Sequence, residues 1–194
     1  MENNVTTRLT KDARRDQLLD VATQIIRDKG TEALTLITLA QAAGVTKPIT
    51  YNHFATRQSL LHAIYKRCDK LFVDTMNAKI EHQAKSFDEA VQLFTEAYLE
   101  CVQQNGREYE EVVFALMAYP DHRHIRRVIR DFFCDVLSDV FRPFVAQREL
   151  LSPLRMAAIF GAIEGIAAMI NESRVKPAEA RRAIEDLLCC QLKG

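Results

Sequence analysis

The sequence lacks the short motifs that mark common catalytic sites. It has no Glu-x-x-His or His-Glu-x-x-His metal motif, no phosphate loop and no nucleophile elbow. No run reaches the ~18 apolar residues of a membrane span, and the N-terminus carries no charged-then-apolar signal segment. These absences predict a cytoplasmic protein that is not an enzyme and has no metal, no cofactor and no membrane partner.

The cysteines also fail to form a pattern. There are five, none in a Cys-x-x-Cys pair: Cys68, Cys101, Cys134, Cys189 and Cys190. An odd number without paired spacing argues against a secreted disulfide scaffold and favours a reducing compartment. Inert core thiols are favoured over a redox sensor.

The chain has no net charge, with 26 Lys and Arg against 26 Asp and Glu, which argues against a general nucleic-acid coat protein. The charges are nevertheless uneven. Residues 1–70 hold 11 basic and 7 acidic side chains, whereas residues 71–194 hold 15 and 19. A basic end on an otherwise acidic chain is typical of a DNA-reading head on a body that avoids DNA.

Helical periodicity runs along the whole chain, without strand-like alternation, repeats or low-complexity tracts. We therefore expect an all-α protein of about nine helices. Outside residues 35–54, the start and stop signals predict helices over residues 11–29, from 57 onward, 86–104, 107–118, 121–148, 153–172 and 177–192. The boundary between 104 and 107 rests on Asn105-Gly106, and a kink is expected near Pro143.

Two short helical patterns meet at residues 43–46. Thr35 can cap the first helix, and Gly44 can adopt positive φ to end it. Thr46 can cap the second helix, and Pro48 fits its first turn. This arrangement is the signature of a helix-turn-helix, whose second helix lies in the DNA major groove. The alternative is an ordinary helical hairpin with a solvated polar face.

The second helix leaves side chains free for DNA. Lys47 is a natural phosphate partner, Asn52 can bond base edges, and Pro48 or Ile49 can contact a thymine methyl group. Tyr51 and Phe54 share a face, and Phe54 is expected to be structural.

Residues 14–65 resemble the DNA-binding domain of TetR-family transcriptional regulators in order and spacing. The matching motifs are Leu18 to Ile26, Gly30, Thr35, Leu39-Ala40, Ala43-Gly44-Val45, Thr46-Lys47, Tyr51-Asn52-His53-Phe54 and Thr56 to Leu60. The chain departs from the family at Thr50, where Leu is usual. We expect Thr50 to pack less tightly or to turn its hydroxyl to a neighbour.

The resemblance implies an N-terminal arm and helix-turn-helix DNA-binding domain over residues 1–56, followed by a helical effector-binding and dimerisation domain over 57–194. It implies that Thr35 and Thr46 bond phosphates, that Lys47, Tyr51 and His53 grip the DNA backbone, that Pro48, Ile49 and Asn52 face bases, and that Arg57 clamps another phosphate. The implied partners are a palindromic double-stranded DNA operator, a second copy of the chain and an unknown small-molecule effector. The implied activity is that of a repressor released by this effector.

Residues 156–170 hold one charge in fifteen positions, which is too apolar for a helix with one dry side. A ridge of small residues, Ala157, Gly161, Gly165 and Ala168, would let another backbone approach. A homodimer interface is favoured over packing inside the monomer, because readers of paired half-sites need two-fold symmetry. Glu164 in this stretch needs a partner, for which an interface ion pair to Arg174 or Arg181 is expected.

Aromatic and methionine side chains are the candidates for an effector pocket, with ordinary core packing as the alternative for each of them. They are Phe72, Met76, Phe94, Tyr98, Phe114, Met117, Phe133 and Phe141.

Two other function classes stay open on the sequence alone. One is a helical enzyme and the other is a protein-interaction module, each with a non-functional helix-turn-helix. The absence of catalytic motifs argues against the enzyme. The intact set of Thr46, Lys47, Tyr51 and His53 argues against a lost DNA function.

Overall fold

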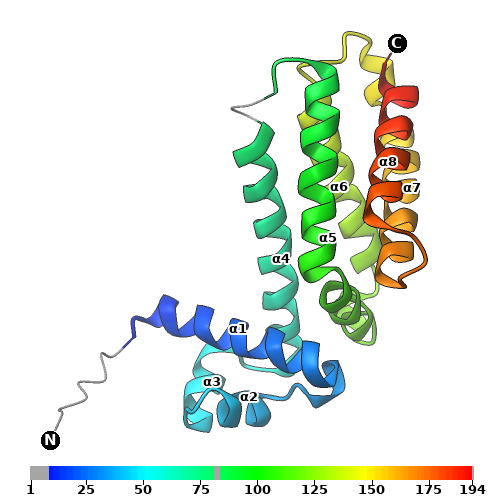
Figure 1. Cartoon of the computed structure of the whole chain (residues 1–194). Coiled ribbons are helices and arrows are strands. Elements are labelled where there is room, and N and C mark those ends of the chain that lie inside the picture. Colours follow the sequence, from blue (N-terminus) through cyan, green and yellow to red (C-terminus); the bar gives the residue numbers. More distant parts are fainter. Residues whose placement is uncertain (1–8, 81–83, 194) are drawn as a thin grey trace, which may run out of the picture.

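The computed structural model describes residues 9–80 and 84–193. Within these ranges it contains eight α-helices, three short 3-10 helices and no strand, so the prediction of an all-α fold is confirmed. The expected N-terminal arm falls mostly within residues 1–8 and lies outside the described residues. The helices form a small head, α1 to α3, at one end of a body made of α4 to α8 (Figure 1).

The elements of the head are α1 (Lys11–Lys29), η1 (Thr31–Ala33), α2 (Leu36–Ala42) and α3 (Lys47–His53). The elements of the body are α4 (Arg57–Ile80), α5 (Phe87–Met117), η2 (Pro120–His122), α6 (Ile125–Phe141), η3 (Arg148–Leu151), α7 (Pro153–Asn171) and α8 (Pro177–Leu192).

Local signals set most of the helix ends. Thr10 begins α1, since its side chain accepts a hydrogen bond from the backbone N–H of Ala13 at 3.2 Å. Gly30 ends α1 with a φ of 76°. Ser86 caps α5 by accepting from the N–H of Glu89 at 3.2 Å. Pro153 and Pro177 open α7 and α8 in their first turns, where proline costs no helical hydrogen bond.

The expected helix break at Asn105-Gly106 is wrong, because α5 continues through it, and eight α-helices replace the expected nine. Gly106 meets a different requirement. A Cβ atom added to it would lie 2.8 Å from Oδ1 of Asn171 on α7. The glycine therefore permits close packing of α5 against α7, and burial on both sides of it outweighs the ~1 kcal/mol cost of a glycine inside a helix.

The long helix expected over residues 121–148 is also wrong in its extent. Asp121 lies in η2, and α6 covers only Ile125–Phe141. The helix ends two residues before Pro143 instead of continuing with a kink. Arg142 still has helical φ and ψ of −53° and −39°, but Pro143 has no N–H with which to continue the helical hydrogen bonds.

Helix α4 connects the head to the body. Leu60, Leu61 and Ile64 in its first turns are buried, each at most 1% exposed, and they belong to the same core cluster as Leu18 of α1. Further along, α4 packs beside α5 in the body (Figure 1). The domain boundary at residue 56 stays a prediction, since the hydrophobic core runs past it through α4.

Candidate functional site

The turn between α2 and α3 is built by short-range contacts. Thr35 and Thr38 form a reciprocal capping box: the side chain of Thr35 accepts from the N–H of Thr38 at 3.0 Å, and the side chain of Thr38 accepts from the N–H of Thr35 at 2.9 Å. Gly44 then turns the chain with a φ of 63°. Both positions behave as the sequence predicts.

Thr50 fixes α3 against α2. Its side chain is fully buried. Its hydroxyl donates to two carbonyl oxygens, that of Lys47 at 2.8 Å and that of Leu36 on α2 at 3.1 Å. The substitution of the family's usual leucine is thus explained by a hydroxyl turned to a neighbouring helix. A buried hydroxyl without such a partner would be costly.

Helix α1 holds the other end of α3. The guanidinium of Arg15 lies 4.7 Å from the ring centroid of Phe54, which is 1% exposed. Nη1 of Arg15 also donates to the carbonyl oxygen of His53 at 3.1 Å. The last turn of α3 is therefore fixed by packing, a cation–π contact and a hydrogen bond.

The opposite side of α3 is open. Thr46, Lys47, Pro48 and Asn52 are exposed, and Tyr51 is 50% exposed. Thr46 occupies the N-cap position, but its side chain accepts no capping hydrogen bond.

Three further expected contacts flank this face. Ile49 and His53 are half-buried on α3, and Thr35 is exposed at the start of α2. Helices α2 and α3, which carry these residues, lie at the end of the head that faces away from the body (Figure 1). We call this set of eight residues, 35, 46–49 and 51–53, the α3 face.

Arg57 does not join the α3 face. Its side chain is 27% exposed, and its guanidinium points inward. Nε donates to the carbonyl oxygen of Leu34 at 2.8 Å, Nη2 to that of Thr31 at 2.7 Å, and Nη1 to the hydroxyl of Tyr119 at 3.2 Å. This arrangement favours a structural role at the junction of head and body over the expected phosphate clamp.

The charge around His53 is positive. Burial lowers the pKa of His53, and the nearby cations Arg15, Lys11 and Arg14 on α1 lower it further. The imidazole is therefore kept neutral near pH 7, and the neighbouring cations attract anions such as DNA phosphates.

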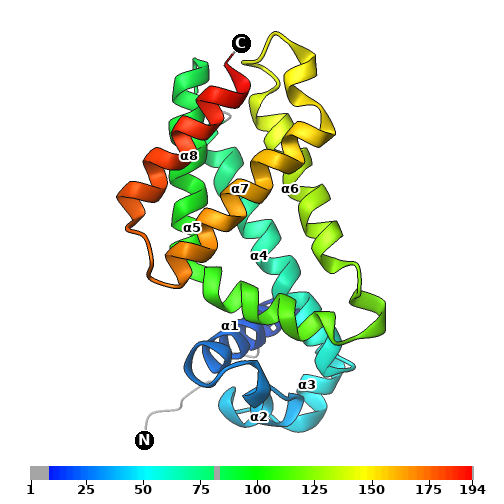
Figure 2. The same cartoon turned by 90° about the vertical axis from the view of Figure 1, so that its right-hand side faces the viewer.

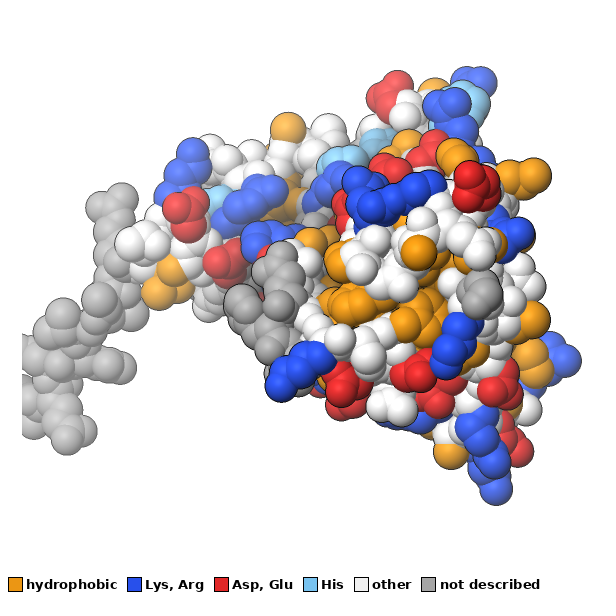
Figure 3. All heavy atoms as spheres, turned by 90° about the horizontal axis from the view of Figure 1, so that it is seen from above, with side chains coloured by type: hydrophobic (Ala, Val, Ile, Leu, Met, Phe, Trp, Pro, Cys, Tyr) orange, Lys and Arg blue, Asp and Glu red, His pale blue; other side chains and the backbone are white. Residues whose placement is uncertain are grey.

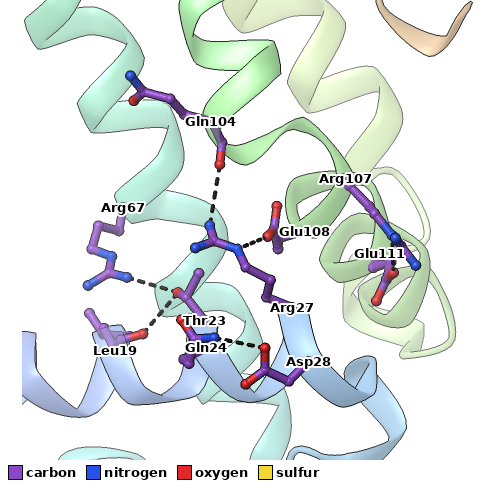
Figure 4. Close-up of polar contacts among 10 residues, drawn as sticks. All are labelled: Leu19, Thr23, Gln24, Arg27, Asp28, Arg67, Gln104, Arg107, Glu108 and Glu111. Atoms are coloured by element: carbon purple, nitrogen blue, oxygen red, sulfur yellow. Dashed lines mark hydrogen bonds and ion pairs between the residues drawn. The ribbon is translucent and has the colours of Figure 1, made fainter. Parts of the chain in front are cut away.

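Polar contacts lock the head to the body at the C-terminal end of α1 (Figure 4). Arg27 forms an ion pair with the largely buried Glu108 of α5, and its Nη2 donates to the carbonyl oxygen of Gln104 at 3.3 Å. Arg67 of α4 donates to Asp20 at 2.7 Å and to the hydroxyl of Thr23 at 2.9 Å. These contacts link α1 of the head to α4 and α5 of the body.

A cavity of about 120 Å³ lies in the body between α4, α5, α6 and α7. Of the expected pocket residues, Phe72, Tyr98 and Phe133 line it. The other five do not line it. Met76, Phe94 and Phe141 are buried in the core, whereas Phe114 and Met117 are 59% and 37% exposed on the surface.

Other lining residues carry the polar chemistry of this cavity and were missed from the sequence. They are Asp69, Asn105, Tyr109, Glu110, Glu164 and Asn171. The sequence signal that could have identified them is helical spacing. Asp69, for example, precedes Phe72 by three positions and therefore lies on the same face of α4. Cys68 lines the cavity too, and burial raises the pKa of its thiol to about 11, which makes it a poor nucleophile at neutral pH.

The predicted small-residue ridge faces outward on α7. Gly161 and Gly165 are exposed, and an added Cβ would meet no described atom within 4 Å at either position. Ala157 and Ala168 are half-buried beside them, and Leu154 on the same helix is 84% exposed. Figure 2 looks directly onto α7 and α8, which form this side of the body.

Two observations qualify the expectations for α7. By length and composition it is apolar enough to cross a membrane, although it carries the charged residues Arg155 and Glu164, and 28% of its apolar 18-residue window is buried. Glu164 lies at the cavity edge and pairs within the chain with Arg126 at 3.7 Å, whereas Arg174 and Arg181 pair with Glu172 and Glu185.

The end of the body that faces away from the head carries side chains of both charges, with hydrophobic side chains gathered between them (Figure 3). Such a mixed surface has no resemblance to a DNA-binding patch, which requires clustered Lys and Arg.

A short exposed helix after a tight turn, presented on a three-helix head, defines the molecule as a helix-turn-helix protein.

Comparison with known proteins agrees with this class. Residues 18–64 match the family described as bacterial regulatory proteins, tetR family. The HTH-type transcriptional activator FasR of Mycolicibacterium smegmatis is 40% identical over 60 residues, which cover 31% of this chain and 27% of that protein. The HTH-type transcriptional repressor KstR2 of Rhodococcus jostii is 34% identical over 56 residues, which cover 29% of this chain and 28% of that protein. The chain thus matches less than a third of the length of either relative.

The whole fold is similar to that of a TetR-like transcriptional regulator from Rhodococcus sp. RHA1. The TM-score is 0.72 at 21% identity, with 96% of this chain and all of that chain covered. The match to the tetR family thus covers residues 18–64, and over the rest of the chain the likeness is one of fold.

Proposed function

We propose that the protein is a homodimeric, sequence-specific DNA-binding transcriptional regulator whose affinity for its operator is set by a small molecule in the body. The observation that carries this proposal is the open α3 face: a two-turn helix, fixed from behind by Thr50 and Arg15, leaves Lys47, Tyr51 and Asn52 free at the tip of the head. Lys47, Tyr51 and His53 would contact the DNA backbone, and Pro48, Ile49 and Asn52 would face the bases.

The outward face of α7 supports the dimer. Two copies that pack Gly161 and Gly165 against each other would place two heads on one side of the assembly, related by a two-fold axis. This symmetry matches a palindromic operator, whose half-sites lie about 34–36 Å apart. The high apolar content of α7 is explained by burial in such an interface.

Helix α4 supports effector control. It contributes Asp69 and Phe72 to the cavity and Leu60 and Ile64 to the core that it shares with the head. A ligand that binds one arrangement of α4 better than another shifts the population of head positions, and it changes DNA affinity by its differential affinity for the two states.

We propose that the protein represses transcription while it is bound to its operator and that the effector releases it from DNA. FasR is named an activator and KstR2 a repressor, so similar DNA-binding heads occur both in proteins that activate transcription and in proteins that repress it. Transcription in vitro from the operator, with and without the protein, tests the direction: fewer transcripts support repression, and more transcripts contradict it.

The operator can be selected from a pool of genomic fragments, and single substitutions then test the α3 face. Lys47→Ala is expected to weaken binding to all sequences about equally and to reduce the slope of log affinity against log salt by about 1, because one phosphate contact is lost. Asn52→Ala is expected to cost about 1–3 kcal/mol at one base pair and to relax preference there. Gel shifts on single-base operator variants measure both effects.

Lys70→Ala provides a matched control, since Lys70 lies on α4 with an exposed side chain paired to Asp74. It should leave the affinity and the salt slope unchanged. Unchanged DNA affinity for Lys47→Ala would contradict the proposed role of the α3 face. Failure of the wild type to retain any fragment would favour the protein-interaction module.

A pH dependence is expected from His53. A phosphate beside it would raise its pKa in the complex above the lowered value of the free protein, so DNA binding takes up a proton. Operator affinity should therefore be highest at low pH and fall as the pH rises from the lowered pKa of His53 in the free protein to its raised pKa in the complex, by about tenfold for each unit of pKa difference. His53→Gln should flatten this profile, and an unchanged profile would exclude His53 as the responsible group.

A further inference from the structure

The charge of the cavity in the body has one sign. Its lining includes three carboxylates, from Asp69 on α4, Glu110 on α5 and Glu164 on α7. Among the described residues that line it there is no Lys, Arg or His. An anionic ligand would enter a site with like charges and no counter-charge.

The cations that offset these carboxylates lie at the edge of the site. Nζ of Lys66 is 3.5 Å from Asp69, and Nη1 of Arg126 is 3.7 Å from Glu164. Both side chains are about half exposed, at 54% and 50%, so each pair is weakened by solvent. Glu110 accepts a hydrogen bond only from Asn171, at 3.1 Å, and no described cation lies within ion-pair distance of it.

Tyr98 adds a hydroxyl to the wall of the cavity. Its side chain is only 7% exposed and lines the cavity, and its hydroxyl is not one of the two buried unpaired hydroxyls of the described residues, which belong to Tyr65 and Thr95. Burial raises the pKa of Tyr98, and the nearby charges of Glu164 and Glu110 raise it further, so both carboxylates act on this hydroxyl. A ligand in the cavity with N–H donors would donate a hydrogen bond to this hydroxyl oxygen.

Aromatic rings form the apolar wall. The ring of Phe133 lies 4.8 Å from that of Phe72 and stacks on that of Phe160 at 4.9 Å between centroids. Aromatic faces attract both flat apolar groups and organic cations. The volume of about 120 Å³ is close to that of cavities, ~150 Å³, that hold one benzene molecule.

We propose that this cavity binds a small organic cation, an ammonium group carried on a flat apolar body. The ammonium group would lie between the hydroxyl of Tyr98 and the carboxylates of Glu110 and Glu164, and the apolar body against Phe133 and Phe160. The role of this cation as the effector rests on the proposed function. Its binding does not, because the site is complete within one chain.

Three probes of similar size and different charge test the site on the full chain. They are benzylammonium, benzyl alcohol and benzoate, with binding measured by calorimetry at neutral pH. Benzylammonium is expected to bind about tenfold or more tightly than benzyl alcohol, because hydrogen bonds to charged groups are the stronger ones, and benzoate to bind most weakly. Equal affinity for benzylammonium and benzyl alcohol, or tighter binding of benzoate, would overturn the proposal.

Substitutions locate the charge recognition. Tyr98→Phe and Glu110→Gln should each weaken benzylammonium by about tenfold and leave benzyl alcohol unchanged. Tyr98→Phe should keep the fold, since it retains the buried ring. Glu172→Gln, an exposed carboxylate outside the cavity, is the matched control and should change neither affinity. Equal losses for both probes would show a structural effect and overturn the assignment.

Arg126→Gln gives a test of opposite sign, since it removes the competing cation from Glu164 and should raise benzylammonium affinity several-fold. A decrease would count against the proposal. Fragment selection on the same preparation separates the two claims. DNA binding without a preference for benzylammonium overturns this inference alone, and benzylammonium binding without DNA binding overturns the proposed function alone.

Discussion

A Gly161→Glu variant is expected to fold, to be monomeric and to bind operator DNA about 10²–10⁴-fold more weakly than the wild type. The affinity of a dimer for a palindrome comes from two heads that bind together, and a monomer loses the second one. The substitution lies on α7, far from the α3 face (Figure 1), so no DNA contact is removed directly.

The variant should not harm the fold of a single chain. An added Cβ at position 161 meets no described atom within 4 Å, and the position is exposed. Replacing glycine inside a helix even adds up to about 1 kcal/mol of helix stability. In the dimer, by contrast, two introduced carboxylates would be buried near the two-fold axis without partners, which is strongly unfavourable.

Ultracentrifugation, thermal melting and gel shifts on a full and a half operator measure the three parts of this prediction. Ala78→Glu, on the exposed side of α4, is the control and should stay dimeric with full affinity. A Gly161→Glu protein that remains dimeric would refute the proposed interface. A monomer that retains full operator affinity would refute the need for paired heads.

The head could be predicted closely from the sequence because its signals act within one helical turn. Thr35 caps α2, Gly44 turns the chain and Pro48 lies in the first turn of α3, each as expected. The unusual Thr50 could be interpreted in the same way, since a hydroxyl in place of leucine requires an acceptor within reach.

The body could be predicted only in part, because its features depend on which faces meet in space. Asn105-Gly106 is a stop signal in isolation, yet α5 passes through it where Asn171 packs against Gly106. The cavity is lined by four helices, so aromatic residues alone could not define it. Phe72 and Tyr98 point into it, whereas Phe94, one turn from Tyr98, belongs to the core.

Arg57 shows what resemblance alone leaves undecided. Its position after α3 implies a phosphate clamp, but its hydrogen bonds to Leu34, Thr31 and Tyr119 tie the first turn of α4 to both head and body. We expect Arg57→Ala to lower the free energy of unfolding by about 2 kcal/mol, because bonds from a charged donor are lost. In a chain of this length, such a loss lowers the melting temperature by about 4–8 °C.

Lys47→Ala and Arg57→Ala should therefore give opposite patterns. Lys47 is exposed on the α3 face, so its removal should spare the melting temperature and reduce the salt slope of operator binding by about 1. Arg57→Ala should lower the melting temperature and leave the salt slope unchanged, since its guanidinium is held by protein acceptors. Calorimetric melting and gel shifts over a salt series distinguish them. A reduced slope at normal stability for Arg57→Ala would restore the phosphate clamp and imply that Arg57 exchanges its internal acceptors for DNA on binding.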